Sequence, residues 1–247
     1  MKDFKHPLFD EVIHYKKVGS TMNEANRLIK SQQIAGNFLL IADKQTSGIG
    51  RKGNSWFSPN GGIWLTAALY GVSIESSLTI FTGICLHKSL CDTFPQLQTE
   101  LKIKWPNDIF LRNRKLAGIL TNYLQFFKYH LIGIGINSNV DKIPEEISQT
   151  AISLKKVLGE EINNEKILKI FFDIFAAELP SFVEGTLDRN YFLRHSFLLG
   201  KKIVLDTDFD RFTGIVKGID KKGALLLELK PGMIQPFLAG TVTKFYL

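Results

Sequence analysis

The chain of 247 residues has room for one large core and a smaller one, and 45% hydrophobic with 22% charged residues is typical of a folded globular protein. No apolar run approaches the roughly 18 residues of a membrane span, and the first ten residues lack the core of a signal peptide, so we expect a cytoplasmic protein. The net charge of +7 favours an acidic partner, although the basic residues are spread along the chain.

The first part of the chain alternates patterns of helices and strands. Thr21-x-x-Glu24 is typical of a capping box and predicts a helix over residues 22–30. Residues 38–42 and 63–69 predict buried strands. The twenty residues between them, 43–62, hold five glycines and a proline, and a loop this long is usually functional or mobile. Residues 78–94 predict a helix containing Cys85 and Cys91, which are too few for a disulfide framework or a four-ligand zinc site.

The middle of the chain predicts a half-exposed strand at 101–105 and then a hairpin. Its strands are 109–111 and 116–124, and residues 112–115 form the turn. A further strand, 129–136, ends at Asn137. Residues 165–179 predict a helix that Pro180 stops, and 186–195 predict a short final helix.

The pattern changes near residue 200. Five short strands, at 201–205, 212–219, 224–229, 234–238 and 242–246, are separated by turn signals, which favours a small β-barrel. We therefore expect two domains, residues 1–197 and 198–247.

The run from Gly48 to Gly53 matches the G-x-G-x-x-G pattern of dinucleotide-binding loops. That function requires a helix to open at the loop, but Pro59, Gly61 and Gly62 follow and exclude a helix of useful length. A glycine loop can still cradle an anion with its backbone amides, and Arg51 could bind phosphate or carboxylate. The indole of Trp56 would suit a purine. A plain surface loop with a core tryptophan remains the alternative.

A second segment combines Lys104-Trp-Pro-Asn-Asp108 with Lys115-Leu-Ala-Gly-Ile-Leu120 across the hairpin. Pro106 fixes the backbone before Asn107 and Asp108, and an aspartate there could hold Mg²⁺ against triphosphate oxygens. Lys104 and Lys115 could converge on a developing negative charge, and Gly118 would let a ligand approach the backbone. An ordinary turn flanked by solvated lysines explains the same residues.

Together these segments resemble the biotin–protein ligases. Residues 45–59 look like that family's Q-x-x-G-x-G-R-x-G-x-x-W-x-S-P loop, and the two segments above match K-W-P-N-D and K-L-A-G-I-L. Residues 20–25 look like S-T-[NM]-x-x-A, residues 133–137 like G-x-G-x-N, and residues 218–228 like part of the C-terminal domain. The motifs occur in order and cover nearly the whole chain.

The resemblance implies an α+β fold: a mixed sheet with flanking helices, the class II synthetase-like catalytic fold, followed by a small SH3-like β-barrel. It also implies two half-reactions. Biotin attacks the α-phosphorus of Mg·ATP to give biotinyl-5′-AMP and pyrophosphate, and a lysine of a biotin carboxyl carrier domain then attacks that mixed anhydride. The substrates would be ATP and biotin, with Mg²⁺ at Asp108.

Roles follow residue by residue from the resemblance. Arg51 and Lys115 are expected to be catalytic, where negative charge develops. The biotin-binding residues would be Ser20, Thr21, Met22, Gln45, Gly48, Ile49, Gly50, Arg51, Lys115 and Gly118. The ATP-binding residues would be Arg51, Trp56, Lys104, Asn107, Lys115 and Asn137. Ile49 departs from the basic or polar residue of many relatives, so only its backbone is given a role.

Two alternatives remain. Lipoate ligases and octanoyltransferases share the fold, but the latter need an activated cysteine, and neither cysteine lies in a glycine-rich turn. The charge of +7 also suggests a nucleic-acid-binding module. The first motif begins at residue 20, which leaves no room for a helix-turn-helix domain, so we expect no sequence-specific DNA binding and assign the charge to an acidic carrier domain. The oligomeric state is open, a homodimer included.

Overall fold

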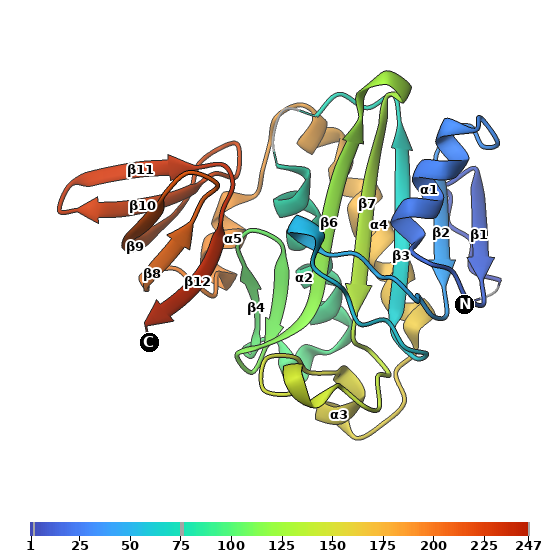
Figure 1. Ribbon diagram of the computed structural model, residues 1–247, viewed down its shortest axis with the longest axis horizontal. Coiled ribbons are helices and arrows are strands. Elements are labelled where there is room, and N and C mark those ends of the chain that lie inside the picture. The colour runs from blue at the N-terminus through green and yellow to red at the C-terminus, as the bar shows by residue number, and fades with distance from the viewer. Residues whose placement is uncertain (2, 75–76, 247) are drawn as a thin grey trace.

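Two β-sheets organise the chain, of which the structure, a computed structural model, describes residues 1, 3–74 and 77–246 (Figure 1). The larger sheet has seven strands in the order β1-β2-β3-β7-β6-β5-β4. Only the β1–β2 pair is parallel, and the other pairs are antiparallel. The strands are β1 (Glu11–Tyr15), β2 (Phe38–Ala42), β3 (Ile63–Tyr70), β4 (Leu101–Lys104), β5 (Asp108–Leu111), β6 (Arg114–Leu124) and β7 (Tyr129–Ile136).

Both faces of this sheet are covered, because its central strands carry apolar side chains on each side. On one face, Leu39 and Ile41 of β2 join the main core with α2 (Leu78–Thr93) and α4 (Asn164–Val183). On the other face, Phe38 and Leu40 pack in a second cluster with α1 (Thr21–Lys30). The sheet therefore forms the middle layer, and α1 lies on the face that carries the cavity described below (Figure 1).

Two details of the helices differ from the sequence prediction. The cap of α1 is Ser20 and not Thr21, because the Ser20 side chain accepts from the backbone N–H of Asn23 at 3.4 Å. Pro180 does not stop α4, which continues to Val183. A proline this near a helix end forfeits few backbone bonds, and Phe182 beyond it is buried and stacked on Phe81 with ring centroids 4.1 Å apart.

The predicted hairpin turn is shorter than expected. Arg112 and Asn113 both adopt left-handed φ values, 50° and 61°, which is the conformation of a two-residue hairpin turn. β6 therefore begins at Arg114 and includes Lys115. Strand β1 and the short helix α3 (Leu154–Leu158) are not predicted by any pattern noted in the sequence.

The C-terminal sheet holds the five predicted strands in the antiparallel order β11-β10-β9-β8-β12. They are β8 (Lys202–Asp206), β9 (Arg211–Ile219), β10 (Leu225–Lys230), β11 (Met233–Phe237) and β12 (Thr241–Tyr246). Within the described residues β11 and β12 do not pair, so the expected barrel is not closed. The domain division at residue 198 stays a prediction; α5 (Arg189–His195) leads into this sheet.

A buried hydrogen bond joins the two sheet regions: the indole Nε1 of Trp105, next to β4, donates to the carbonyl of Gly223 at 3.1 Å. Arg189 of α5 donates its Nε to the carbonyl of Ile219 in β9 at 3.0 Å, a partly buried bond. The expected α+β class is confirmed. None of the helices in the described ranges is both long and apolar enough to cross a lipid bilayer.

Candidate active site

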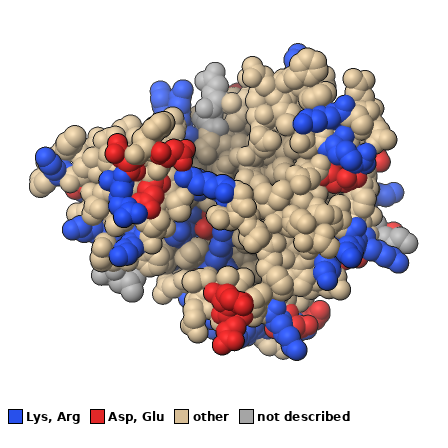
Figure 2. All heavy atoms as spheres, in the orientation of Figure 1, with Lys and Arg blue, Asp and Glu red and all other residues tan. Residues whose placement is uncertain are grey.

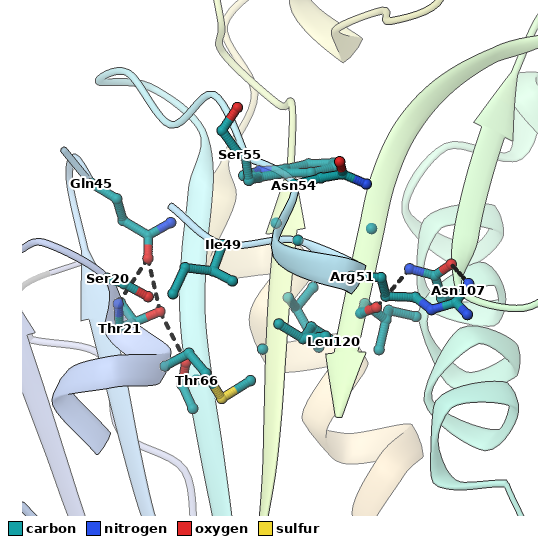
Figure 3. Close-up of a pocket in the computed structure, with 18 of the residues that line it drawn as sticks. Ser20, Thr21, Gln45, Ile49, Arg51, Asn54, Ser55, Thr66, Asn107 and Leu120 are labelled. Carbon is teal, nitrogen blue, oxygen red and sulfur yellow. Dashed lines mark hydrogen bonds between the residues drawn. The ribbon is translucent and has the colours of Figure 1, made fainter. Parts of the chain in front are cut away.

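A cavity of about 200 Å³ lies on the α1 side of the large sheet, between that helix and the predicted glycine loop (Figure 3). Its floor is formed by β3, β6 and β7. Most residues singled out from the sequence line it: Ser20, Thr21, Met22, Gln45, Ile49, Gly50, Arg51, Trp56, Asn107, Asp108, Lys115 and Gly118. Segments nearly 100 residues apart in sequence therefore meet at one site.

One end of the cavity is uncharged and internally hydrogen-bonded. The backbone N–H and the hydroxyl of Thr21 both donate to Oε1 of Gln45, at 2.8 and 3.1 Å. The Thr66 hydroxyl donates to Oγ1 of Thr21 at 2.9 Å (Figure 3). Gln45 Nε2 donates to the Ser58 hydroxyl at 2.9 Å. Donors and acceptors are thus placed on rigid elements, where they suit a neutral ligand group that offers both.

The loop that closes the cavity is anchored at its base. Thr46 and Ser47 donate their backbone N–H groups to the carbonyls of Val18 and Gly19, which sets Gln45 beside the start of α1. Gly48 does not line the cavity. A Cβ there would lie 2.5 Å from the carbonyl oxygen of Trp56 and 2.7 Å from Ser58 Oγ, so the loop base closes only around a glycine.

The opposite end of the cavity is cationic. The guanidinium of Arg51 donates to Asn107 Oδ1 at 3.4 Å (Figure 3) and, on its other side, to the carbonyl of Gly240 at 3.1 Å. Asn107 is itself fixed, since its Nδ2 donates to the carbonyl of Ile119 at 2.9 Å and its carbonyl accepts from the N–H of Ile119 at 2.8 Å. Burial lowers the pKa of Arg51, and the attraction of Asp108 and Asp208 opposes that shift.

Lys115 links this end to Trp56. Its ammonium lies 2.7 Å from Oδ1 of the buried Asp108, at ion-pair distance but outside hydrogen-bond geometry, and 4.8 Å from the centre of the Trp56 ring. The indole rests on the floor: a Cβ would lie 2.9 Å from it on Gly118 and 2.4 Å from it on Gly135. Small residues at these positions leave room for an aromatic ring or a ligand.

A second cavity, of about 320 Å³, adjoins the first and shares Ser55, Trp56, Asp108 and Lys115 with it. Lys104 and Asn137, the remaining predicted nucleotide ligands, line this second cavity. Burial lowers the pKa of Lys104, and repulsion from Lys115 and Arg51 lowers it further while Asp108 opposes. Three cations therefore surround one carboxylate, an arrangement that can accept an anionic ligand.

Some lining residues escaped the sequence analysis. Thr66 is the lone hydroxyl among the buried residues 63–69 of β3, a signal that could have marked it. Gly133 and Gly135 belong to the G-x-G-x-N motif of residues 133–137, in which only Asn137 was assigned a role. Thr241 comes from β12, and no local pattern connects it with the cavity.

Comparison with known proteins agrees with this geometry. The family model described as the biotin/lipoate A/B protein ligase family matches residues 15–139, and the model for the biotin protein ligase C terminal domain matches residues 198–244. The chain is 30% identical over 233 residues to the bifunctional ligase/repressor BirA of Bacillus subtilis, covering 90% of this chain and 70% of that relative. It is 28% identical to a biotin–[acetyl-CoA-carboxylase] ligase of Paracoccus denitrificans, with 85% and 91% covered.

Among solved structures, the chain is similar to the biotin protein ligase from Aquifex aeolicus in complex with biotin and ATP. The TM-score is 0.81 at 27% identity, with 96% of this chain and 98% of that one covered. Fold, sequence and the placement of the motif residues around one cavity lead to the same conclusion: the chain belongs to the biotin/lipoate A/B protein ligase family.

Proposed function

We propose that this protein is an ATP-dependent biotin–protein ligase, which converts biotin and ATP to biotinyl-5′-AMP and pyrophosphate and then transfers biotin to a lysine of a biotin carboxyl carrier domain. One observation carries the proposal: a single cavity joins an uncharged hydrogen-bonding end to a cationic end. Biotin has the matching polarity, with a ureido ring at one end and a carboxylate at the other. Since the first half-reaction consumes ATP, the proposal includes a cytoplasmic setting.

In this proposal the ureido ring binds at Ser20, Thr21 and Gln45. A buried ureido group left without partners would cost about 1–3 kcal/mol for each unmatched donor or acceptor, so the network at this end is the element that selects biotin. The apolar chain of biotin would pass Met22, Ile49, Gly50 and Gly118, which line the cavity, and Gly48 would act only by closing the loop base behind them.

Arg51 and Lys115 are the proposed catalytic residues. When the biotin carboxylate attacks the α-phosphorus, negative charge develops on the phosphate oxygens, and these two fixed cations would stabilise it. Trp56, Lys104, Asn107 and Asn137 would bind the nucleotide, with the indole as the surface available to adenine.

The proposal includes Mg²⁺ as the partner of ATP. In the described ranges no three His, Cys, Asp or Glu side chains are grouped so that they could hold a metal by themselves, and Asp108 is the carboxylate that lines both cavities. This fits Mg²⁺, which takes one or two carboxylates together with substrate phosphates. Asp108 would hold the ion, which supplies charge neutralisation at the phosphates when bound.

In the second half-reaction the amine of the carrier lysine attacks the carbonyl carbon of the mixed anhydride. The new amide bond forms as the bond to AMP breaks, and AMP leaves with the electron pair. Until then the anhydride must be kept from water, and the loop from Gly48 to Trp56 covers the cavity in which it would lie.

An octanoyltransferase of the same fold would use a cysteine thiolate. Both cysteines are buried in α2, and burial raises the pKa of Cys91 to about 11 and that of Cys85 as well. Neither is therefore a suitable nucleophile. Biotin-dependent exchange between ATP and pyrophosphate tests the proposal directly, with lipoate and octanoate run beside biotin. We expect exchange in the presence of biotin and none with lipoate or octanoate. Exchange that occurs only with lipoate or octanoate would overturn the proposed function.

A repressor function is not part of the proposal. Before α1, in residues 1 and 3–20, the structure contains β1 and no helix, so these residues form no helix-turn-helix. The basic side chains are dispersed over the face seen in Figure 2 and do not form one continuous patch there. A gel shift with sequence-specific binding to a biotin-operon promoter would contradict this view.

A further inference from the structure

The tip of the glycine loop touches the C-terminal sheet through two charged side chains. Lys52 Nζ lies 2.7 Å from Oδ1 of Asp208, and Arg51 Nη2 donates to the carbonyl of Gly240 at 3.1 Å. Both contacts run from this loop to turns of the C-terminal sheet, and neither belongs to the strand pairing of either sheet. They bear on the site because Arg51 lies at the cationic end of the cavity.

The loop is shaped so that its tip acts as a unit. Ile49 and Ser55 form an antiparallel bridge, and the N–H groups of Gly50 and Trp56 donate to the carbonyls of Asn54 and Gly48. Lys52 sits at the turn with φ of 54°, a left-handed conformation that is unfavourable for a residue with a side chain. An external contact at Lys52 therefore helps to hold the neighbouring Arg51 in place.

The partner surface on the C-terminal sheet is a tight turn between β8 and β9. Thr207 Oγ1 accepts from the backbone N–H groups of Phe209 and Asp210, and the N–H of Thr207 donates to the carbonyl of Asp210 at 2.9 Å. Asp208 projects from this turn. Gly240 packs closely against β8, because a Cβ there would lie 2.7 Å from the side chain of Leu205.

The charges explain why this contact concerns the active site. In the described part of the chain Arg51 has no carboxylate within ion-pair distance, and its donors face an amide oxygen and a backbone carbonyl. Asp208 is a nearby acid that attracts both cations of the loop tip. Removing its charge would loosen Lys52 and weaken the field that keeps Arg51 at the cavity.

We propose that Asp208 is a positioning residue of the ligase: through Lys52 it holds the loop tip closed and keeps the Arg51 guanidinium at the phosphate end of the cavity. This inference rests on the proposed function for its effect on the adenylate, whereas the contact itself can be tested without any activity. The C-terminal sheet thereby takes part in retaining the intermediate.

Limited trypsin digestion of the full chain tests the contact, because trypsin cuts after Arg51 and Lys52. We expect Asp208→Asn to speed cleavage at these two bonds about two- to fivefold, the effect of losing an exposed ion pair. Asp210→Asn is the matched control. Asp210 lies on the same turn, and its hydrogen bonds within the turn are made by its backbone, which the substitution leaves in place. At about 1 M salt the difference should vanish, because charges are then screened within about 3 Å.

The functional arm measures biotinyl-adenylate release, by trapping it on an added amine. Asp208→Asn should release it severalfold faster and raise the KM for ATP, with the rate of transfer at saturating carrier retained, and Asp208→Glu should restore most of the wild-type behaviour. If Asp208→Asn matches Asp210→Asn in both cleavage and release, the inference is wrong. A wild-type protein without biotin-dependent exchange would instead refute the proposed function and leave the digestion result to decide on the contact.

Discussion

The two ends of the cavity are built differently. At the uncharged end, Thr21 and Thr66 stand on a helix and a strand, and Gln45 is bonded to both Thr21 and Ser58. At the cationic end, Arg51 stands on a loop whose tip is held from another sheet, and Lys115 and Lys104 share one carboxylate. The first end offers neutral donors and acceptors, which suit recognition, while the second offers fixed cations, which suit stabilisation of developing negative charge. Substitutions should therefore affect binding at one end and chemistry at the other.

The largest effect is expected for Lys115→Ala. Loss of a fixed cation where charge develops should lower biotin-dependent pyrophosphate exchange about 100- to 1000-fold, while biotin binding measured by calorimetry changes far less. Lys30→Ala, an exposed lysine at the end of α1, serves as the control. Wild-type exchange in a folded Lys115→Ala protein would remove this residue from the catalytic step.

A smaller effect of a different kind is expected for Gln45→Ala. It removes the acceptor of two Thr21 bonds and the donor to Ser58, so the KM for biotin should rise about 5- to 150-fold, the range for one unmatched buried polar group. The kcat at saturating biotin should change little. Gln125→Ala, at the exposed far end of β6, is the comparison, and an equal fall in kcat would show that the two ends are not separable.

Arg51→Gly should mainly change how well the intermediate is retained: the loop opens, and Lys115 stays as the second cation, so exchange should fall less than in Lys115→Ala. Biotinyl-adenylate should escape and label unintended lysines severalfold more often, as mass spectrometry of bystander proteins would detect. Arg112→Gly is the matched control because it makes the same substitution on an exposed hairpin turn. Unchanged bystander labelling with full activity would mean that Arg51 does not retain the intermediate.

Strong local patterns predicted most of the fold. The strand at Phe38–Ala42 was predicted with its observed bounds, because a short apolar run between turn signals favours a buried strand. β1 was missed because an edge strand with partly exposed side chains lacks such a run. The prediction that the helix ends at Pro180 was wrong, because the packing of Phe182, which is a tertiary contact, outweighs the local preference of proline to stop a helix.

The sequence predicted the site residues that belong to motifs, but it did not predict the contacts between them. The ordered motifs placed Arg51, Asp108 and Lys115 near one another, and the structure brings them to one cavity. The pairing of Thr21 with Gln45 joins residues that are 24 positions apart, and the contact of Arg51 with Gly240 joins residues 189 positions apart. Such contacts depend on how helices and sheets pack, which no short window of sequence specifies.

The hydrogen-bond chain at the uncharged end has one direction. Thr66 donates to Thr21, Thr21 to Gln45, Gln45 to Ser58, and Ser58 to the carbonyl of Trp56 at 3.1 Å. Each bond is already made before a ligand arrives, so an entering ureido group exchanges bonds with the protein and adds few new ones. The net gain from polar contacts is then small, as for most hydrogen bonds exchanged on association. Affinity should come mainly from burying the ring and chain of biotin, and the polar groups should act by rejecting ligands that cannot complete the exchange.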